Sequence, residues 1–300
     1  MLSRKREEEN LDFVESYAEN SMEFIKVYSK TKKSYFTVAP ERGAIVVLLN
    51  LSGKDILYLN KETLFDKTKN IRGGIPILFP ICGRVVDGKI TFKGQEYPMK
   101  NHGFARDTAW EVVGYIDELS LNGVVLKLSS SGFTKTFYPY DFELFIKYTI
   151  NDEIFGVEMI VKNNDREELP FYAGFHPYFL CNKDEFTLKL DCEKCFDDVE
   201  KKFVDLENFK ELDFSKPEIN LDFFDVGSKS IEFTLDKDKK LLLVKDKSFK
   251  NIVVWSLKDY GFVCIEPWMG EHEGYLQNKY YYLKPNDIFK ATFAIILNKE

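Results

Sequence analysis

The sequence predicts a nearly all-β protein, made of many short antiparallel strands in one domain. Along 142–150 and again along 155–161, apolar residues occupy every second position, which is the period of a half-buried strand. The 27 Phe and 16 Tyr residues also favour strands. No internal repeat and no linker rich in Gly, Pro or Ser divides the chain. We therefore expect residues 21–300 to form a single domain.

A charged N-terminal segment precedes a series of short predicted strands. Residues 1–20 are charged but place Leu11, Phe13, Val14 and Tyr17 near helical spacing, which predicts an N-terminal extension, either a short helix or frayed. Residues 191–230 are rich in charge with weak periodicity, which predicts loops with a short helix or an edge strand. The remaining alternating or apolar segments predict strands at 35–38, 44–49, 56–59, 90–92, 96–97, 142–150, 155–161, 186–190, 231–235, 252–255, 262–265 and 293–297.

Charge and cysteine content limit the possible partners and the location. A net charge of −7 argues against nucleic acid or an anionic membrane surface as partner. No run approaches the ~18 apolar residues of a membrane-spanning helix, and the first residues lack the apolar region of a signal peptide. The five scattered cysteines fit a reducing compartment better than a disulfide framework. We therefore expect a cytoplasmic protein.

Two titratable residues stand in settings suited to acid–base chemistry. His176 is followed by Pro177, which favours extended backbone before it, and aromatic residues flank the pair. Such a histidine is either a proton donor and acceptor facing a pocket or a hydrogen-bonded core residue. Glu266 ends an apolar strand next to Pro267-Trp268, where apolar surroundings would raise its pKa. For a lone glutamate, a solvated or ion-paired strand end is the commoner alternative.

Three arginines mark the loops that are rich in glycine. The chain has seven Arg against 35 Lys, yet the cations of these loops are Arg72, Arg84 and Arg106. The guanidinium fork suits carboxylates, phosphates or vicinal hydroxyls, which an ammonium matches less well. The alternative is that each arginine braces its own loop through backbone carbonyls.

The sequence offers no recognisable metal or nucleotide motif. The three histidines, at 102, 176 and 272, form neither a His-x-His nor a His-x-x-x-His pair. Cys192 and Cys195 form a lone Cys-x-x-Cys without a second pair for zinc. No glycine-rich loop opens a helix after a parallel strand. We therefore expect neither metal nor cofactor.

Five motifs in a fixed order resemble the aldose 1-epimerase superfamily, the galactose mutarotase-like proteins, over residues 21–298. The motifs are Arg72-Gly-Gly-Ile-Pro76, Leu78-Phe-Pro-Ile-Cys-Gly-Arg84, Asn101-His-Gly-Phe-Ala-Arg106, Gly174-Phe-His-Pro-Tyr-Phe179 and Ile265-Glu-Pro-Trp268. The resemblance implies a β-supersandwich, a large antiparallel fold of two sheets with a concave sugar-binding face. It also implies an epimerase that needs neither metal nor cofactor.

The resemblance assigns the central residues by position. It implies that His176 is the acid at the sugar ring oxygen and that Glu266 is the base at the anomeric hydroxyl. His102 matches a second histidine that contacts the sugar.

The remaining positions mix two branches of the family. Arg84 resembles the sugar-contacting arginine of true mutarotases and of the LacX-like branch. Arg72 and Arg106, with Asn101 alongside, resemble phosphate-contacting positions of the glucose-6-phosphate 1-epimerase branch. The family also has a sugar-contacting aspartate between acid and base, for which the chain offers Asp225 and Asp222.

Three functions follow as expectations. The first is an aldose 1-epimerase that interconverts hexose anomers, and the second is a hexose-6-phosphate 1-epimerase. The third is a silent sugar-binding protein on the same fold, which would not need an acid–base pair. The expected partner is a small sugar or sugar phosphate, and the chain is expected to be a monomer or a homodimer.

Overall fold

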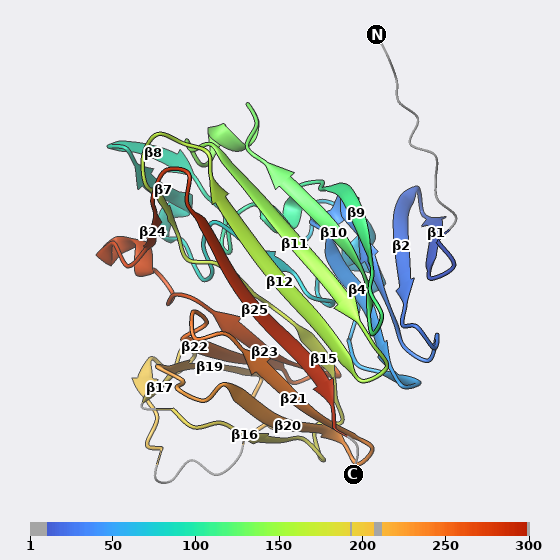
Figure 1. Cartoon of the computed structure of the whole chain (residues 1–300). Coiled ribbons are helices and arrows are strands. Elements are labelled where there is room, and N and C mark those ends of the chain that lie inside the picture. Colours follow the sequence, from blue (N-terminus) through green and yellow to red (C-terminus); the bar gives the residue numbers. More distant parts are fainter. Residues whose placement is uncertain (1–10, 193, 207–211, 299–300) are drawn as a thin grey trace.

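The computed structural model describes residues 11–192, 194–206 and 212–298, and these consist mainly of antiparallel strands (Figure 1). The long strands β10, β11, β12 and β25 run side by side across the centre of the view, and β19, β22 and β23 lie below them. The prediction of a nearly all-β protein is confirmed.

The first of two eight-stranded sheets has long central strands whose side chains alternate between buried and more exposed. In β11 (Phe142–Ile150) every second side chain is buried, as the sequence pattern predicted. In spatial order the sheet consists of β16 (Thr187–Lys189), β20 (Ser230–Asp236), β21 (Lys239–Lys245), β25 (Ile288–Leu297), β12 (Ile154–Asn163), β11, β10 (Asn122–Ser129) and β9 (Glu111–Asp117).

The second eight-stranded sheet carries the residues of chemical interest. Its central strand β23 (Phe262–Trp268) is buried along its whole length. The sheet runs in the order β18 (Lys202–Phe203), β17 (Lys194–Asp197), β19 (Glu218–Phe224), β22 (Asn251–Leu257), β23, β14 (Gly174–Phe175) and β6 (Ile77–Leu78), and β15 (Tyr178–Leu180) also pairs with β23.

Aromatic side chains from both eight-stranded sheets meet in one continuous core. Phe293 of β25 lies 4.8 Å from Phe175 of β14 between ring centroids, and Phe233 of β20 lies 4.9 Å from Phe179 of β15. These contacts join the two sheets face to face, and this burial of large aromatic rings stabilises the sandwich.

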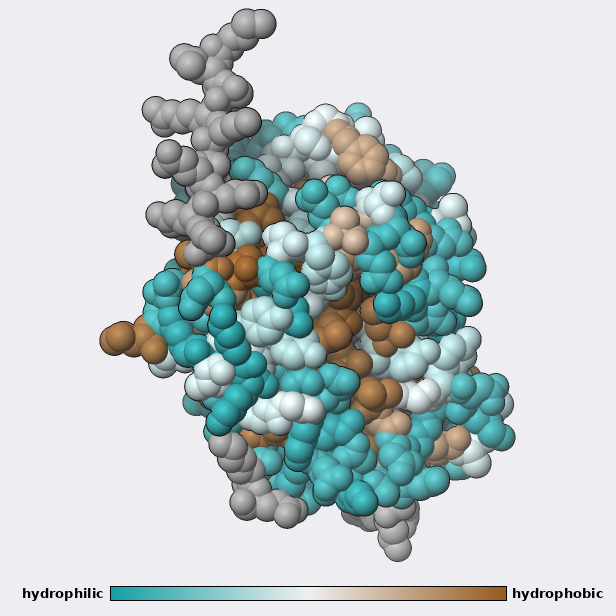
Figure 2. Space-filling view, turned by 90° about the vertical axis from the view of Figure 1, so that its right-hand side faces the viewer, coloured by the Kyte–Doolittle hydropathy of each residue, from teal (hydrophilic) through white to brown (hydrophobic). Residues whose placement is uncertain are grey.

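A five-stranded N-terminal sheet completes the main layers. Its order is β1 (Val14–Glu19), β2 (Met22–Tyr28), β3 (Tyr35–Ala39), β4 (Ile45–Leu51) and β5 (Lys54–Asp55). Figure 2 shows the molecule from the side of this sheet, where hydrophilic residues cover most of the surface around a narrow hydrophobic band.

A short helix is one of two predictions for residues 1–20, and it is wrong for residues 14–19, because these residues form strand β1. Residues 1–10 lie outside the described residues. Asn20 and Ser21 both have positive φ, at 50° and 62°, and they join β1 to β2 with Glu19 opposite Met22. Two positive-φ residues are what a two-residue hairpin turn of type I′ requires. The geometry of this turn therefore favours a strand at residues 14–19, although the apolar spacing suggested a helix.

A second correction concerns residues 191–230. Their strand β19 is no edge strand, because it lies between β17 and β22. Its burial alternates around Ile219, Leu221 and Phe223, so the period of two was present but was obscured by the charged residues around it. The strand expected at 56–59 is reduced to isolated bridges at Leu57 and Leu59.

The remaining elements are short. Two small sheets pair β7 (Lys89–Phe92) with β8 (Gln95–Pro98), and β13 (Leu169–Phe171) with β24 (Tyr281–Leu283). The helical segments are α1 (Lys61–Phe65) and the 3₁₀ turns η1 (Pro40–Arg42), η2 (Val86–Gly88), η3 (Ala105–Asp107), η4 (Thr134–Thr136) and η5 (Gly274–Gln277). Among the described residues, no helix has the length and apolar character to cross a membrane.

Candidate active site

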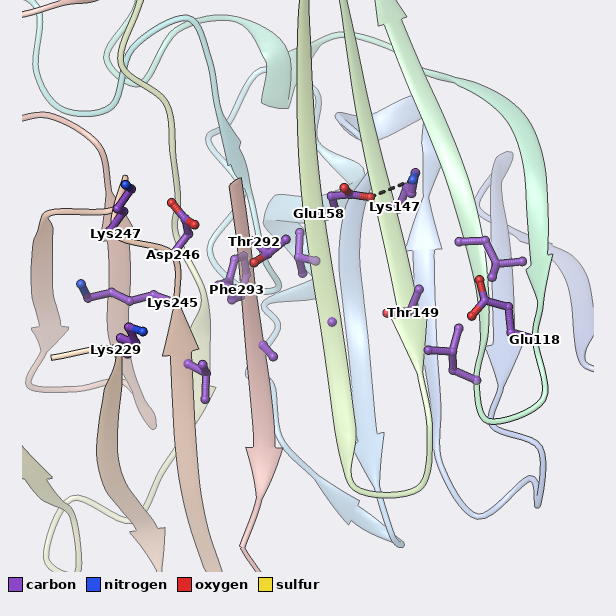
Figure 3. Close-up of a pocket in the computed structure, with 16 residues that line it drawn as sticks. Glu118, Lys147, Thr149, Glu158, Lys229, Lys245, Asp246, Lys247, Thr292 and Phe293 are labelled. Carbon is purple, nitrogen blue, oxygen red and sulfur yellow. Dashed lines mark ion pairs between the residues drawn. The ribbon is translucent and has the colours of Figure 1, made fainter. Parts of the chain in front are cut away.

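Two cavities differ in the chemistry of their walls. The larger, about 660 Å³, lies on the first eight-stranded sheet, and its polar lining consists of lysines, acidic residues and threonines. Lys147 and Glu158 in this lining form an ion pair at 2.8 Å (Figure 3). The smaller, about 330 Å³, lies on the second sheet and is lined by His102, His176 and His272 together with Glu266. Because the smaller cavity gathers the chain's histidines around a buried carboxylate, it is the candidate active site.

Strand β23 brings Glu266 to this cavity. Val263 and Ile265 point into the main core, so the alternate residues Cys264, Glu266 and Trp268 lie on the opposite face. The register places Tyr178 of β15 and Trp255 of β22 on either side of Cys264. Glu266 follows Cys264 on this face and lines the cavity, and only 1% of its surface is exposed.

His176 is fixed by the backbone on both sides of it. Its N–H donates to the carbonyl of Pro76 at 3.1 Å, and the N–H of Tyr178 donates to Gly74 at 2.9 Å. The imidazole stacks on the Tyr178 ring, with centroids 4.7 Å apart and planes within 7°. Nε2 of His176 then lies 3.4 Å from Oε1 of Glu266. The structure thus favours the pocket-facing histidine over the hydrogen-bonded core histidine.

Burial moves both members of this pair toward their neutral forms. Loss of water around the imidazole, followed by the positive charge of Arg106, lowers the pKa of His176 to about 3. Burial raises the pKa of Glu266 well above its ordinary value, although Nε1 of Trp268 donates to its second oxygen at 3.1 Å. The solvated alternative for Glu266 is therefore wrong.

His102 enters the cavity from a tight loop. Gly103 beside it has φ +75°, and a Cβ there would lie 2.1 Å from the carbonyl oxygen of Phe79, so only glycine fits. Nδ1 of His102 accepts from the N–H of Gly83 at 3.1 Å, which leaves the proton of the neutral ring on Nε2. Desolvation lowers the pKa of His102 well below its ordinary value, so the ring is a neutral donor.

Arg84 lines the cavity but is held by a carboxylate. Its two terminal nitrogens donate to the two oxygens of Asp198, one of them at 2.7 Å. Such a two-pronged pair fixes the guanidinium plane. Arg84 can therefore bind a ligand only through the guanidinium N–H groups that do not donate to Asp198.

Arg72 and Arg106 also line the cavity, and neither has a carboxylate within ion-pair distance among the described residues. The guanidinium carbon of Arg72 lies 5.6 Å from the Trp255 ring centroid, and its buried Nη1 has no partner. Arg106 donates to the Asn70 side chain and to the Asn101 carbonyl, but its buried Nε has no partner. Both arginines thus keep unused donors.

The other predicted positions divide between the cavity and the surface. Asn101 lines the cavity, and its side-chain oxygen accepts from the N–H of Val85 at 2.9 Å. Asp225, directly after β19, is exposed and does not line the cavity, so the structure does not support the predicted sugar contact of Asp225. Asp222, its alternative, is buried.

Sequence reasoning missed the pair formed by His272 and Asp222. Nε2 of His272 lies 3.6 Å from Oδ1 of Asp222, and both atoms are buried without a hydrogen-bond partner. Nδ1 of His272 accepts from the N–H of Arg84 at 3.2 Å, so the neutral ring carries its proton toward Asp222. Burial raises the pKa of Asp222 to about 7 and lowers that of His272 to about 4.

Strand β19 also supplies cavity residues that were not predicted. Glu218 and Asn220 line the cavity, and the Glu218 carboxylate accepts from Nε1 of Trp255 at 2.8 Å. The side-chain oxygen of Asn220 is a buried acceptor without a partner. Alternation along 218–224 would have revealed this polar face.

A possible metal-ligand group lies at the same place. The ligand atoms of His176, Cys264 and Glu266 all lie within 4.8 Å of one another, and the three residues are buried. Spacing along the chain did not indicate this group, because its members come together only through strand pairing.

Most of the chain is similar to known proteins. The family model described as aldose 1-epimerase matches residues 27–298. The plasmid-encoded protein LacX of Lactococcus lactis subsp. lactis is 30% identical, over 75% of this chain and 86% of LacX.

Two solved structures share the architecture. The Slr1438 protein of Synechocystis sp. PCC 6803 is 26% identical with a TM-score of 0.84, covering 96% of both chains. A galactose mutarotase related enzyme of Lactobacillus acidophilus is 21% identical with a TM-score of 0.73, covering 95% of this chain and 97% of that one. The galactose mutarotase-like sandwich expected from the sequence is confirmed.

Proposed function

The chain belongs to the aldose 1-epimerase family, and we propose that it interconverts the α and β anomers of a hexose through proton transfers by Glu266 and His176. Glu266 takes the proton of the anomeric hydroxyl while His176 gives a proton to the ring oxygen. The bond between C1 and the ring oxygen breaks, which leaves an open-chain aldehyde. Rotation about C1–C2 turns the other face of the aldehyde to the ring hydroxyl, and the reverse transfers close the ring.

The pair needs only one shared proton for this cycle. The proton lies either on the carboxyl group beside a neutral imidazole, or on the imidazole beside a carboxylate. Burial favours the first arrangement, because it lowers the pKa of His176 and raises that of Glu266. Ring opening converts the imidazolium beside a carboxylate into the neutral imidazole beside a protonated carboxyl group, so the reaction removes two buried charges. Nε2 of His176 and Oε1 of Glu266 are 3.4 Å apart, so a small approach brings them to hydrogen-bond distance, across which the proton can return from one group to the other.

The cavity suits a monosaccharide. A volume of about 330 Å³ is at the small end of small-molecule sites. The proton on Nε2 of His102 and the unpartnered oxygen of Asn220 offer one donor and one acceptor to sugar hydroxyls. Positioned acid and base groups each contribute ~10²–10⁴-fold to such a reaction.

The observation that carries this proposal is the contact between Glu266 and His176 on the floor of a sugar-sized cavity. The test measures anomer exchange by magnetisation-transfer NMR with glucose, galactose and glucose 6-phosphate in parallel. Acceleration above the spontaneous exchange for at least one sugar is expected. Binding of these sugars without any acceleration would leave only the sugar-binding alternative.

A hexose 6-phosphate is the second candidate substrate. It is favoured by Arg72 and Arg106, which line the cavity with unpartnered buried nitrogens. A charge-assisted hydrogen bond to a phosphate oxygen would satisfy each of them. The guanidinium of Arg84, in contrast, is already paired with Asp198, which leaves it less available for either kind of sugar.

A further inference from the structure

Three side chains of different chemistry converge beneath the cavity. Cys264 and Glu266 stand two residues apart on one face of β23, and the register places Tyr178, two residues after His176, opposite Cys264. As a result, the imidazole, the thiol and the carboxylate have ligand atoms within 4.8 Å of one another. The thiol has no part in the anomer exchange described above.

We propose that His176, Cys264 and Glu266 form an inhibitory binding site for a zinc-class divalent cation. The three groups supply nitrogen, sulfur and oxygen, which are the ligand atoms that zinc takes in proteins. The cation replaces the proton that the acid–base pair shares, so catalysis and metal binding exclude each other. Binding of the cation is independent of the proposed epimerase function, and only its inhibitory effect rests on that function.

The distance between the first two ligands already fits a tetrahedral centre. Ligands about 2.0–2.1 Å from zinc are separated by roughly 3.4 Å at the tetrahedral angle, and Nε2 of His176 lies 3.4 Å from Oε1 of Glu266. The sulfur needs a separation of roughly 3.6 Å from each of them. Because the three ligand atoms lie within 4.8 Å of one another, a shift of at most about 1.2 Å brings the sulfur to that separation. His176 and Glu266 line the cavity, which leaves the fourth position open to water.

Charge balance favours the complex in a buried place. Binding releases two protons, one from the Cys264 thiol and one from the pair of His176 and Glu266. The thiolate and the carboxylate then neutralise the divalent cation, so no net charge is left in the low-dielectric site. The positive charge of Arg106, which opposes protonation of His176, also opposes the free cation and thereby limits the affinity.

The test uses cobalt(II), which reports its ligands through colour. Titration of the purified protein with Co²⁺ should give visible bands of a tetrahedral centre and a near-ultraviolet sulfur-to-cobalt band, and zinc should remove both. Cys264→Ala should lose the sulfur band and weaken metal binding by ~10-fold or more, because the soft ligand is gone. Cys195→Ala, another buried cysteine, is the matched control and should keep the band.

The activity measurement then separates the two proposals. Zinc should inhibit anomer exchange by the wild type and by Cys195→Ala, and chelation should restore it, while Cys264→Ala should resist. Cys264→Ser serves as a second variant, and thermal unfolding of each variant checks its fold. Absence of a sulfur band in the wild type, or its persistence in Cys264→Ala, overturns the site whether or not the protein is active. A band in a protein without epimerase activity would refute only the proposed function.

Discussion

Oε1 of Glu266 lies 3.4 Å from Nε2 of His176, and burial disfavours a charge on both groups. The two groups therefore hold one proton over a wide pH range. A second proton enters only in acid, since the pKa of His176 is lowered to about 3, and the last proton leaves only above the ordinary range of a carboxyl group, since the pKa of Glu266 is raised.

The pH dependence of catalysis should follow this proton. We expect a bell-shaped rate profile, because the doubly protonated pair lacks a base and the fully deprotonated pair lacks an acid. The limits belong to the pair rather than to either residue. Anomer exchange measured by NMR from acid to basic pH checks this, with circular dichroism at each pH to confirm folding. A flat profile over the whole folded range would contradict the assignment.

Asp222 should make stability depend on pH. Its pKa rises from 3.8 to about 7 on folding, so between these values the folded protein holds a proton that the unfolded chain has lost. The contribution of Asp222 to the free energy of unfolding then decreases as pH rises from about 4 to about 7. Asp222→Asn has no carboxyl group to titrate. Its free energy of unfolding should therefore rise by a few kcal/mol relative to wild type across that interval, at about 1.4 kcal/mol per pKa unit.

Urea unfolding at acid and neutral pH measures this gain. Asp225→Asn, which changes an exposed carboxylate three residues away, is the matched control and should follow the wild type. If the difference in free energy of unfolding between Asp222→Asn and wild type stays constant with pH, Asp222 is charged in the folded protein and the prediction is wrong.

Arg72 should distinguish phosphorylated from free sugars. If its guanidinium binds a phosphate, Arg72→Ala loses a charged hydrogen bond worth roughly 1.5–3 kcal/mol and raises the KM for glucose 6-phosphate by ~10–100-fold. The KM for free glucose should barely change. Arg166→Ala removes an exposed charge outside the cavity and controls for net charge. An unchanged ratio of kcat/KM values for the two sugars would make Arg72 a brace of its loop.

Removal of metal should leave catalysis intact. Anomer exchange by Glu266 and His176 needs only proton transfers, so exhaustive dialysis against a chelator should leave the rate unchanged, or raise it if zinc occupies the proposed inhibitory site. Activity that is lost to the chelator and restored by one divalent ion would contradict a metal-independent mechanism.

Local patterns predicted the strands whose faces differ in polarity. The alternation around Phe142 and Ile150 predicted β11 correctly, and the apolar run before Glu266 predicted the start of β23. The cavity residues that carry recognisable motifs, among them His176 and Arg72, were also found. These features depend on neighbours along the chain, which a sequence displays.

What the sequence did not reveal depends on pairing between distant segments. His272 meets Asp222 across 50 residues, and Cys264 meets His176 through the register of β15 with β23. No local pattern sets these registers. The N-terminal hairpin was missed for a different reason, because the positive φ values of Asn20 and Ser21 decide it rather than the apolar spacing.

The most direct test of the proton-transfer account is Glu266→Gln, which keeps the shape of the side chain and removes the base. Anomer exchange and sugar binding are measured on the same sample, by magnetisation-transfer NMR and by calorimetry, and Trp268→Phe controls for loss of the indole hydrogen bond to Glu266. We predict that Glu266→Gln lowers the exchange rate by at least ~10²-fold while the sugar still binds. Exchange at a near-normal rate in Glu266→Gln would contradict the role of Glu266 as the base.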